Sequence, residues 1–432
     1  MKKLFIFFII NMTMCANYDR LVLANLYSYY NIPDAYKNIL EPLASDSKLQ
    51  KKIVISKSSL PLFQKFSDLR EKLSHVELCD LPSPIIKCPN LEEFFQLKNF
   101  SIKDDGQIGK IVDGGKLYSG NKARKLEFLL ADAMSCGVKN VLTFGMAGSN
   151  HALATTIYTN LIGLKSICML KPQHNDYTLQ RNLLLQKYYG AELIYCLNDD
   201  MRIFLTCAQL VKNKLELGEF PYVIPTGGSC PLGVIGYVNA AFELHDQIKN
   251  KIICEPDLIY LPLGSAGTAA GLILGIKLLK LKSKIVLVAV EPTDIKELEK
   301  KLFKLINDAN ELLHELDSNI PQIKIETDDY EILTEHCGDD YALYTIEEIE
   351  SMNLIKKLES IKLDGVYTGK TFAGMLKHIL KNNLIDKNIL FWNTFCSDDF
   401  KTLTNTIDYK NLPTPFHKYF EEDVQPFCKL LN

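Results

Sequence analysis

The stretch SGNKARKLEFLL, residues 119–130, is the part of the sequence around which the predicted fold is built. Lys122 and Lys125 stand three residues apart where a glycine turn leads into a helix, and apolar side chains such as Leu126 and Leu129 recur behind them at helical spacing. Two ammonium groups this close repel each other unless an anion lies between them or one of them is neutral. The alternative to such a site is a first helical turn whose basic side chains are solvated. The rest of the sequence is needed to choose between these two interpretations.

The composition is that of an ordinary globular protein. Of 432 residues, 47% are hydrophobic and 23% are charged, and the length suits two or three domains. The net charge of −3, with basic residues dispersed along the chain, argues against a nucleic-acid partner. The twelve cysteines form no Cys-x-x-Cys and no zinc spacing, so we expect mostly buried, reduced thiols and no metal site.

The amino-terminal part contains two expected segments. Residues 1–16 have the charged start and short apolar run of a secretory signal, although the run is too short to span a bilayer. We expect a signal segment and an exported protein; the alternative is a first core strand in a cytoplasmic one. Residues 17–75 are expected to form a helical extension, including one helix from Pro61 in which Leu62, Phe66 and Leu69 repeat at helical spacing.

From residue 100 onward, short apolar runs alternate with helical patterns. Strands alternating with helices of 10–15 residues predict parallel sheets covered on both faces, with ligands at the carboxyl ends of the strands. We predict strands at 100–103, 141–144, 166–170, 193–196, 258–261 and 285–290, and helices at 150–161 and 179–189.

Two glycine-containing turns follow predicted strands and open predicted helices. The first, GMAGSNH at 145–151, offers hydroxyl, amide and backbone N–H groups to a carboxylate or a ring oxygen, unless Ser149 or Asn150 only caps the helix. The second, GSAGT at 264–268, lets the backbone approach an anion at a helix N-terminus. Because it lacks both the P-loop and the Gly-x-Gly-x-x-Gly spacing, it suits one phosphate better than a dinucleotide, and a plain tight turn is the alternative.

A further stretch, DGVYTGK at 364–370, supplies a phenol at Tyr367 and a neutral hydroxyl at Thr368. Another tyrosine, Tyr341, lies 26 residues before Tyr367. Each of these residues taken singly is more often a core or surface residue. Taken together, a lysine pair, a cradle for one phosphate, a Ser-Asn helix start and two tyrosines on a parallel-sheet frame fit pyridoxal phosphate.

These motifs resemble those of the D-cysteine desulfhydrases and 1-aminocyclopropane-1-carboxylate deaminases, which are fold-type II pyridoxal phosphate enzymes. GNKARKLEF (120–128) is similar to the family's Gly-Asn-Lys-x-Arg-Lys-Leu-Glu-[Phe/Tyr], SNH (149–151) to its Ser-Asn-[His/Gln], and PTGGS with PLG (225–233) to its Pro-x-Gly-Gly-Ser and Pro-Leu-Gly. GSAGT (264–268) and VYTGK (366–370) match two further motifs. The resemblance runs from about residue 81 to about residue 393.

The resemblance implies an α/β fold of the tryptophan synthase β type. Two parallel-sheet α/β domains would hold the cofactor between them, beside the helical N-terminal extension. Residues 76–135 and 216–432 would form the larger, pyridoxal phosphate-binding domain, and residues 136–215 the smaller one. The family's habit also implies a homodimer acting on a small amino acid.

Carried over position by position, the resemblance implies roles for the residues of these motifs. Lys122 would be the Schiff-base lysine and catalytic base, and Lys125 a phosphate contact. The remaining residues would be Asn150 at the phenolic oxygen of the cofactor, Gly264, Ser265, Ala266, Gly267 and Thr268 at its phosphate, Thr368 at its pyridine nitrogen, and Ser149, Asn150, His151, Tyr341 and Tyr367 on the substrate side, with Ser149, Tyr341 and Tyr367 counted as catalytic.

Thr368 bears on the choice of reaction. The resemblance implies that the deaminases have a glutamate at this position, which would keep the pyridine nitrogen of the cofactor protonated. A threonine there implies a neutral ring, which is suited to β-elimination from D-cysteine. Asn393-Thr394, at the position of the family's His-Thr, also favours the desulfhydrase activity. The deaminase activity is the alternative. The family's two following glycines are replaced by Phe395 and Cys396, and its Gly-Gly-Ile-Gln is Gly-Met-Ala-Gly at 145–148, so a catalytically impaired cofactor-binding relative is a further alternative.

Overall fold

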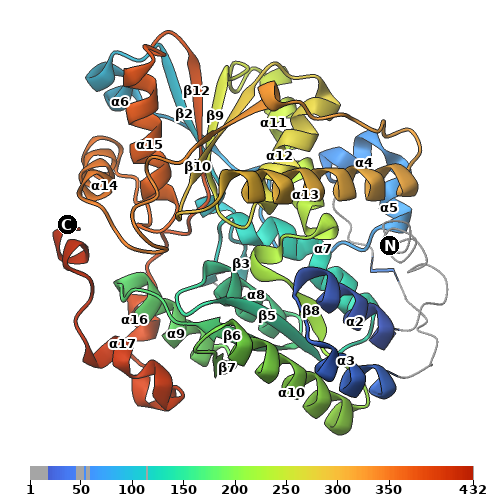
Figure 1. Ribbon diagram of the computed structural model, residues 1–432. Helices are drawn as coiled ribbons and strands as arrows, with labels where there is room; N and C mark the ends of the chain where they lie inside the picture. Colours follow the sequence, from blue (N-terminus) through green and yellow to red (C-terminus); the bar gives the residue numbers. More distant parts are fainter. Residues whose placement is uncertain (1–17, 45–52, 55–58, 113–114, 432) are drawn as a thin grey trace.

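The computed structural model describes residues 18–44, 53–54, 59–112 and 115–431. The expected signal segment, residues 1–16, lies outside the described residues. Two sheets form the frame, one in the upper and one in the lower half of Figure 1. This arrangement agrees with the predicted fold of two α/β units that are built on parallel sheets.

The larger sheet has six strands in the order β1-β2-β12-β9-β10-β11. All neighbouring strands pair in parallel except the edge strand β1, which is antiparallel to β2. An antiparallel edge on an otherwise parallel sheet is common in α/β folds. The strands are β1 (Ile85–Lys87), β2 (Asn99–Asp104), β9 (Leu258–Leu263), β10 (Lys284–Ala289), β11 (Tyr330–Leu333) and β12 (Asn388–Asn393).

Both faces of this sheet are covered by helices, which explains why its central strand β9 is buried at every position. Successive side chains of a strand point to opposite faces. Ile259 and Leu261 therefore join the cluster made with α11, α12 and α13, whereas Tyr260 joins the cluster made with α6, α14 and α15. These helices are α6 (Pro89–Phe95), α11 (Pro231–Lys249), α12 (Gly267–Leu279), α13 (Ile295–Leu316), α14 (Ile346–Glu359) and α15 (Thr368–Lys381).

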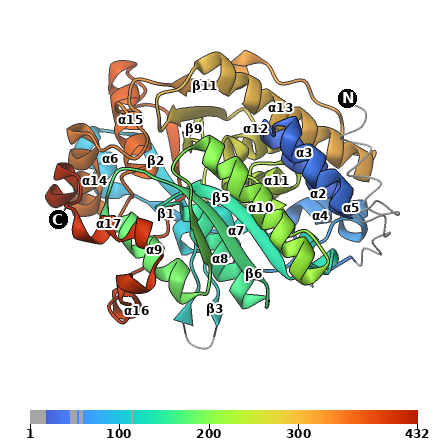
Figure 2. The ribbon, with the colours of Figure 1, turned by 60° about the horizontal axis from the view of Figure 1, so that its bottom comes forward.

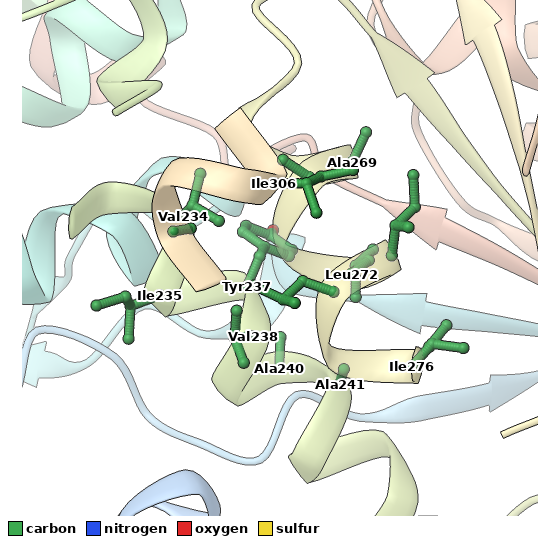
Figure 3. Packing of buried hydrophobic residues seen from close by; sticks show 14 of the residues in the cluster. Val234, Ile235, Tyr237, Val238, Ala240, Ala241, Ala269, Leu272, Ile276 and Ile306 are labelled. Carbon is green, nitrogen blue, oxygen red and sulfur yellow. The ribbon is translucent and has the colours of Figure 1, made fainter. Parts of the chain in front are cut away.

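Glycines let α11 and α12 approach each other closely, and Figure 3 shows apolar side chains of the cluster that these helices form. A Cβ atom on Gly271 would lie 2.4 Å from the Cβ of Tyr237, and one on Gly275 would lie 2.4 Å from the Cβ of Ala241. Ile306 of α13 and Leu272 of α12 pack in the same cluster. This packing holds the start of α12, and the loop before it, in a fixed position against the sheet.

The smaller sheet has four parallel strands in the order β7-β6-β5-β8. Its last strand lies beyond the segment 136–215 expected for the smaller domain, because β8 pairs with β5. Helix α8 packs on the same face as α9 and α17, with Thr156 of α8 contacting Cys168 and Ser166 of β6, whereas α10 packs on the other face, where Arg202 lies over the Phe144 ring of β5. The elements are β5 (Asn140–Met146), β6 (Lys165–Lys171), β7 (Glu192–Tyr195), β8 (Tyr222–Ile224), α8 (Asn150–Leu161), α9 (Tyr177–Tyr188), α10 (Asp199–Leu217), α16 (Lys401–Thr404) and α17 (Lys418–Glu421).

The described amino-terminal part consists of short helices and connecting segments, but the single helix predicted from Pro61 is wrong. The chain forms α4 (Pro61–Lys65) and α5 (Ser67–Lys72), because Phe66 between them has φ −130° and ψ 88°. The break lets Phe66 pack its ring against Phe242 of α11. Helix α2 (Tyr18–Tyr29) instead packs against β8 of the smaller sheet, and α3 (Asp34–Leu40) lies beside α10 (Figure 2).

Helix α7 (Asn121–Ser135) lies between the two sheets, and almost all its residues are buried. Phe128 packs in the cluster of the larger sheet, whereas Leu126 packs in that of the smaller. A buried ion network fixes its first turn, with Arg124 Nη2 at 2.8 Å from Asp105 and Arg124 Nη1 at 3.0 Å from Glu243.

Lys103 completes this network, with its Nζ 2.6 Å from Glu243 Oε1. Replacing one partner of such a buried network would leave uncompensated charge, so these contacts set the position of the two lysines that precede and follow Arg124.

The cysteines of the described residues form no disulfide, and all but Cys254 and Cys337 are buried. Within the same residues, no group of three histidine, cysteine or acidic side chains is arranged to hold a metal ion. No described helix is both long enough and apolar enough to cross a membrane.

Candidate functional site

A cavity of about 180 Å³ lies where the carboxyl ends of strands from both sheets meet. The turns after β5 and β8 supply one side, and those after β9, β10 and β12 supply the other. Of the residues predicted from the sequence, Lys122, Ser149, Asn150, His151, Gly264, Ser265, Ala266, Thr268, Tyr341 and Tyr367 line the cavity. The other three, Lys125, Gly267 and Thr368, are buried and do not line it.

Lys122 occupies the second position of α7 and points its amine into this cavity. The amine donates to Asn121 Oδ1 at 2.9 Å and lies 5.7 Å from the centre of the Tyr367 ring. Burial of the ammonium lowers the pKa of Lys122 to about 8, although the nearby Asp364 carboxylate raises it. An amine that is partly neutral near physiological pH suits both Schiff-base formation and proton transfer.

Lys125, one turn further along α7, is buried behind the glycine loop. Its Nζ donates to Gly227 O at 3.1 Å and to Ser229 Oγ at 3.5 Å, and Ser229 Oγ in turn donates to Ser265 Oγ at 2.7 Å. Burial lowers the pKa of Lys125 well below its ordinary value, and the charge of Lys122 lowers it further. The solvated basic turn considered from the sequence is therefore wrong for Lys125.

The loop after β9 has the geometry of an anion cradle. Its backbone leads into α12, whose N-terminal N–H groups and dipole favour an anion. A Cβ atom on Gly267 would lie 2.6 Å from Ser229 Oγ and 2.8 Å from Lys125 Nζ, so only glycine admits these groups here. Ala266 has φ +67°, in the left-handed region that favours glycine, so the loop holds backbone strain beside the cavity.

Ser149 and His151 belong to the first turn of α8. Ser149 caps this helix, because its Oγ accepts from Ala152 N at 3.2 Å, so the capping role considered from the sequence is present beside a place on the cavity wall. His151 lies with Nε2 3.1 Å from Thr143 Oγ1, and its Nδ1 has no partner among the described residues. Burial lowers the pKa of His151 well below its ordinary value, and both motif lysines lower it further, which keeps the ring neutral.

Tyr341 and Tyr367 both line the cavity and contact each other. Their hydroxyl oxygens lie 2.6 Å apart. Burial raises the pKa of Tyr341 well above its ordinary value, and burial likewise raises that of Tyr367, so both hydroxyls keep their protons. Tyr341 and Tyr367, which are 26 residues apart in the sequence, are therefore in direct contact in the structure.

Thr368 is completely buried at the start of α15, and its hydroxyl is committed to a carboxylate. Its Oγ1 donates to Asp364 Oδ1 at 2.6 Å and accepts from the backbone N–H of Asp364 at 2.9 Å. Asp364 itself lines the cavity. Direct contact of Thr368 with the pyridine nitrogen therefore stays a prediction, and the structure adds an acidic group that bonds this hydroxyl and itself lines the cavity.

Several cavity residues did not emerge from the sequence. Asn121 links the lysine to the cradle, because its Nδ2 donates to Thr268 Oγ1 at 3.0 Å. Glu291 stands two residues after the end of β10, and Lys301 reaches the same cavity from α13. Burial raises the pKa of Glu291, and burial lowers that of Lys301. The position of Glu291 at the carboxyl end of a parallel strand was the signal that could have identified it.

Phe395, which stands where the related motif has glycine, lines the cavity and is almost fully buried. Its ring lies 5.6 Å from the guanidinium carbon of Arg181. Cys396 points away, with its Sγ near Ser119 N and Asp398 Oδ2 at 3.4 Å each. The replacement of glycine has therefore added an aromatic wall to one side of the cavity.

Comparison with known proteins identifies the family. Residues 76–394 match the family model described as pyridoxal-phosphate dependent enzyme. A protein from Pyrococcus furiosus named "Putative 1-aminocyclopropane-1-carboxylate deaminase" is 32% identical over 337 residues, which are 76% of this chain and 94% of that protein. A protein of the same name from Thermotoga maritima is 32% identical over 320 residues, which are 74% of this chain and 95% of that protein.

A solved structure described as an ACC deaminase homologue superimposes with a TM-score of 0.65 at 29% identity, covering 82% of this chain and 98% of that one. The chain belongs to the pyridoxal-phosphate dependent enzyme family, in its fold-type II branch. Its cofactor is pyridoxal phosphate.

The cavity suits this cofactor on chemical grounds of its own. A phosphate needs several donors, and the cradle offers Ser265, Thr268 and the buried amine of Lys125 beside a helix N-terminus. An aldehyde needs an amine that can lose its proton, and Lys122 is that amine.

Proposed function

We propose that this enzyme is a lyase that acts on a small amino acid, with D-cysteine and water as substrates and pyruvate, ammonia and sulfide as products. The observation that carries the proposal is the Lys122 amine, with its pKa lowered to about 8, in the same cavity as the Gly264–Thr268 cradle. Bound pyridoxal phosphate supplies the electron sink for breaking bonds at the α-carbon, and the protein supplies orientation and proton transfer.

Lys122 Nζ is the group placed to accept the α-proton of the substrate. At pH 8 about half of these amines are neutral, so both the accepting and the donating form are present. A positioned base of this kind contributes about 10²–10⁴-fold to the rate. Asp364 holds the lysine pKa from falling further, which keeps the protonated form available for returning a proton.

Two groups of cavity residues divide the binding of the substrate. The first turn of α8 presents the Ser149 hydroxyl and a helix N-terminus, which together suit the substrate carboxylate. The paired hydroxyls of Tyr341 and Tyr367 remain protonated and face the position of a leaving group. Phe395 and Tyr367 add aromatic surface that excludes water from the reacting atoms.

Two candidate substrates follow from the residues near the expected ring nitrogen. The neutral hydroxyl of Thr368 favours elimination from D-cysteine. The names of the relatives from Pyrococcus furiosus and Thermotoga maritima, and the Asp364 carboxylate that bonds this hydroxyl and lines the cavity, favour deamination of 1-aminocyclopropane-1-carboxylate as the second candidate.

The deciding experiment is turnover by the purified enzyme with pyridoxal phosphate on a panel of D- and L-amino acids and the cyclopropane amino acid. We expect pyruvate and sulfide from D-cysteine, and a loss of at least about 10²-fold in Lys122→Ala and in Lys122→Arg, which keeps the charge. Retained activity in Lys122→Ala would remove the mechanism. Formation of 2-oxobutyrate from the cyclopropane substrate in place of sulfide release would transfer the proposal to the second candidate.

A catalytically impaired relative is separated from both candidates by the same preparation. Such a protein would gain the visible band of bound cofactor yet turn over no member of the panel. The expected homodimer and the expected removal of residues 1–16 stay predictions, which sedimentation analysis and amino-terminal mass spectrometry test.

A further inference from the structure

The side-chain amide of Asn150 is held in one orientation by two donors. Tyr118 Oη donates to Asn150 Oδ1 at 3.1 Å, and Asn182 Nδ2 donates to the same oxygen at 2.9 Å. Burial raises the pKa of Tyr118, so its hydroxyl keeps the proton that it donates. Because an atom approached by two donors has to be the oxygen, the amide nitrogen of Asn150 is turned to the other side.

Both hydrogens of the Asn150 amide nitrogen are available to a ligand. Asn150 lines the cavity, and neither N–H of its Nδ2 has an acceptor among the residues that the structure describes. A donor on a cavity wall can be met by water and can bond an acceptor that displaces it. The Asn150 amide nitrogen is therefore placed to donate to an acceptor oxygen of the molecule that fills the cavity.

Asn182 is itself completely fixed. It is fully buried on α9, and its second amide hydrogen goes to Gly148 O at 2.8 Å. Its Oδ1 accepts from Arg181 Nε at 3.1 Å and from Arg181 Nη2 at 3.0 Å. All four hydrogen-bonding positions of the Asn182 amide are thus used, which leaves it one possible orientation.

Arg181 is held in turn by two aromatic rings. Its guanidinium carbon lies 5.6 Å from the ring centre of Phe395 and 5.9 Å from that of Phe400, within the range of cation–π attraction. Phe400 also packs against Tyr118, with ring centres 6.0 Å apart. Phe395, which replaces a glycine of the related motif, therefore supports this arrangement in addition to lining the cavity.

We propose that Tyr118 and Asn182 are positioning residues that aim the Asn150 amide at the ring oxygen of pyridoxal phosphate, and that Arg181 and Phe395 hold Asn182 in place. The proposal rests on the proposed function only in taking the cofactor as the occupant of the cavity. It also assigns a function to Phe395, which replaces a glycine of the related motif, because its larger side chain supplies an aromatic surface for Arg181.

The consequence is a property of the bound cofactor that absorbance can follow. A hydrogen bond donated to the ring oxygen stabilises its negative charge and weakens its hold on the proton shared with the adjacent nitrogen. The visible band of the bound cofactor should therefore titrate at lower pH when Asn150 is correctly aimed. Losing that aim should raise the titration midpoint by about one pH unit, which is a tenfold change in proton affinity.

The test compares the pH titration of the visible band in the holoenzyme with that in Asn182→Leu and Tyr118→Phe. We expect the midpoint to rise by about one unit in Asn182→Leu and by a smaller amount in Tyr118→Phe, which keeps one of the two donors. Gln186→Met is the matched control, because Gln186 is equally buried on α9 and bonds the backbone of Asn182 but does not touch Asn150. Its midpoint should stay at the wild-type value.

Apart from Tyr118 itself, the titratable groups in and around the cavity are the same in all four proteins. Besides the tyrosine pair, these groups are Lys122, Lys125, His151, Glu291, Lys301 and Asp364. Asn182→Leu also removes the acceptor of Arg181, whereas Tyr118→Phe keeps it, so a shift in both variants separates the amide from the guanidinium. An unchanged midpoint in both variants would overturn the inference, as would an equal shift in Gln186→Met. If Asn182→Leu does not fold, Tyr118→Phe alone decides. A wild-type protein that gains no visible band with pyridoxal phosphate would contradict the cofactor site itself, which is a separate failure.

Discussion

The pH at which Lys122 loses its proton gives the sharpest check of the site. Burial lowers the pKa of this amine from 10.5 to about 8, and Asp364 opposes the change. At pH 7 an amine of pKa 8 is about 9% neutral, whereas one of pKa 10.5 is about 0.03% neutral. The cavity therefore increases the reactive form of this lysine by about 300-fold near neutral pH.

Trace acetylation of protein prepared without cofactor, followed by mass spectrometry of each lysine, measures this pKa directly. Labelling of Lys122 should rise with a midpoint close to pH 8, and the 88% exposed Lys324 serves as an internal reference for the reagent. In Asp364→Asn the midpoint should move to lower pH, because the carboxylate that favours the ammonium is gone. A midpoint near 10.5, or a move to higher pH in that variant, would refute the argument that burial activates this lysine.

Three further predictions follow from the packing of the site. Gly267→Ala should weaken equilibrium binding of pyridoxal phosphate by at least about tenfold, because the new Cβ would lie 2.6 Å from Ser229 Oγ, and unchanged affinity in equilibrium dialysis would contradict the cradle. Arg124→Met should lower the stability measured by urea unfolding by about 3–5 kcal/mol, since it breaks a buried ion network, whereas Lys429→Met, which breaks an exposed pair with Asp423, should cost less than about 1 kcal/mol. Burial opposes the ionisation of Glu243, but Arg124 and Lys103 lower the pKa of this carboxyl group from 4.5 to about 2. The contribution of ionised Glu243 to stability is therefore complete above pH 4.5 and is lost as the pH falls through 2. Glu243→Gln should accordingly flatten the loss of stability between pH 4.5 and 2, and an unaltered acid profile would rule that contribution out.

Most of the local structure could be predicted from the sequence. Helix 150–161 was predicted with the bounds that α8 has, and the runs at 141–144 and 258–261 lie inside β5 and β9. These elements were predictable because apolar periodicity and flanking glycines act within a few residues. The one-helix prediction from Pro61 failed because Phe66 leaves the helical conformation to pack on Phe242, which lies 176 positions away.

The sequence by itself determined which residues follow strands and open helices, and therefore which groups could face a ligand. Only the tertiary structure decided that Glu291 and Lys301 share the cavity, that Thr368 is bonded to Asp364, and that Arg181 lies between Phe395 and Phe400. The physical reason is range. Backbone preferences are set by near neighbours, whereas desolvation of an amine and the aiming of an amide depend on side chains that arrive from both sheets.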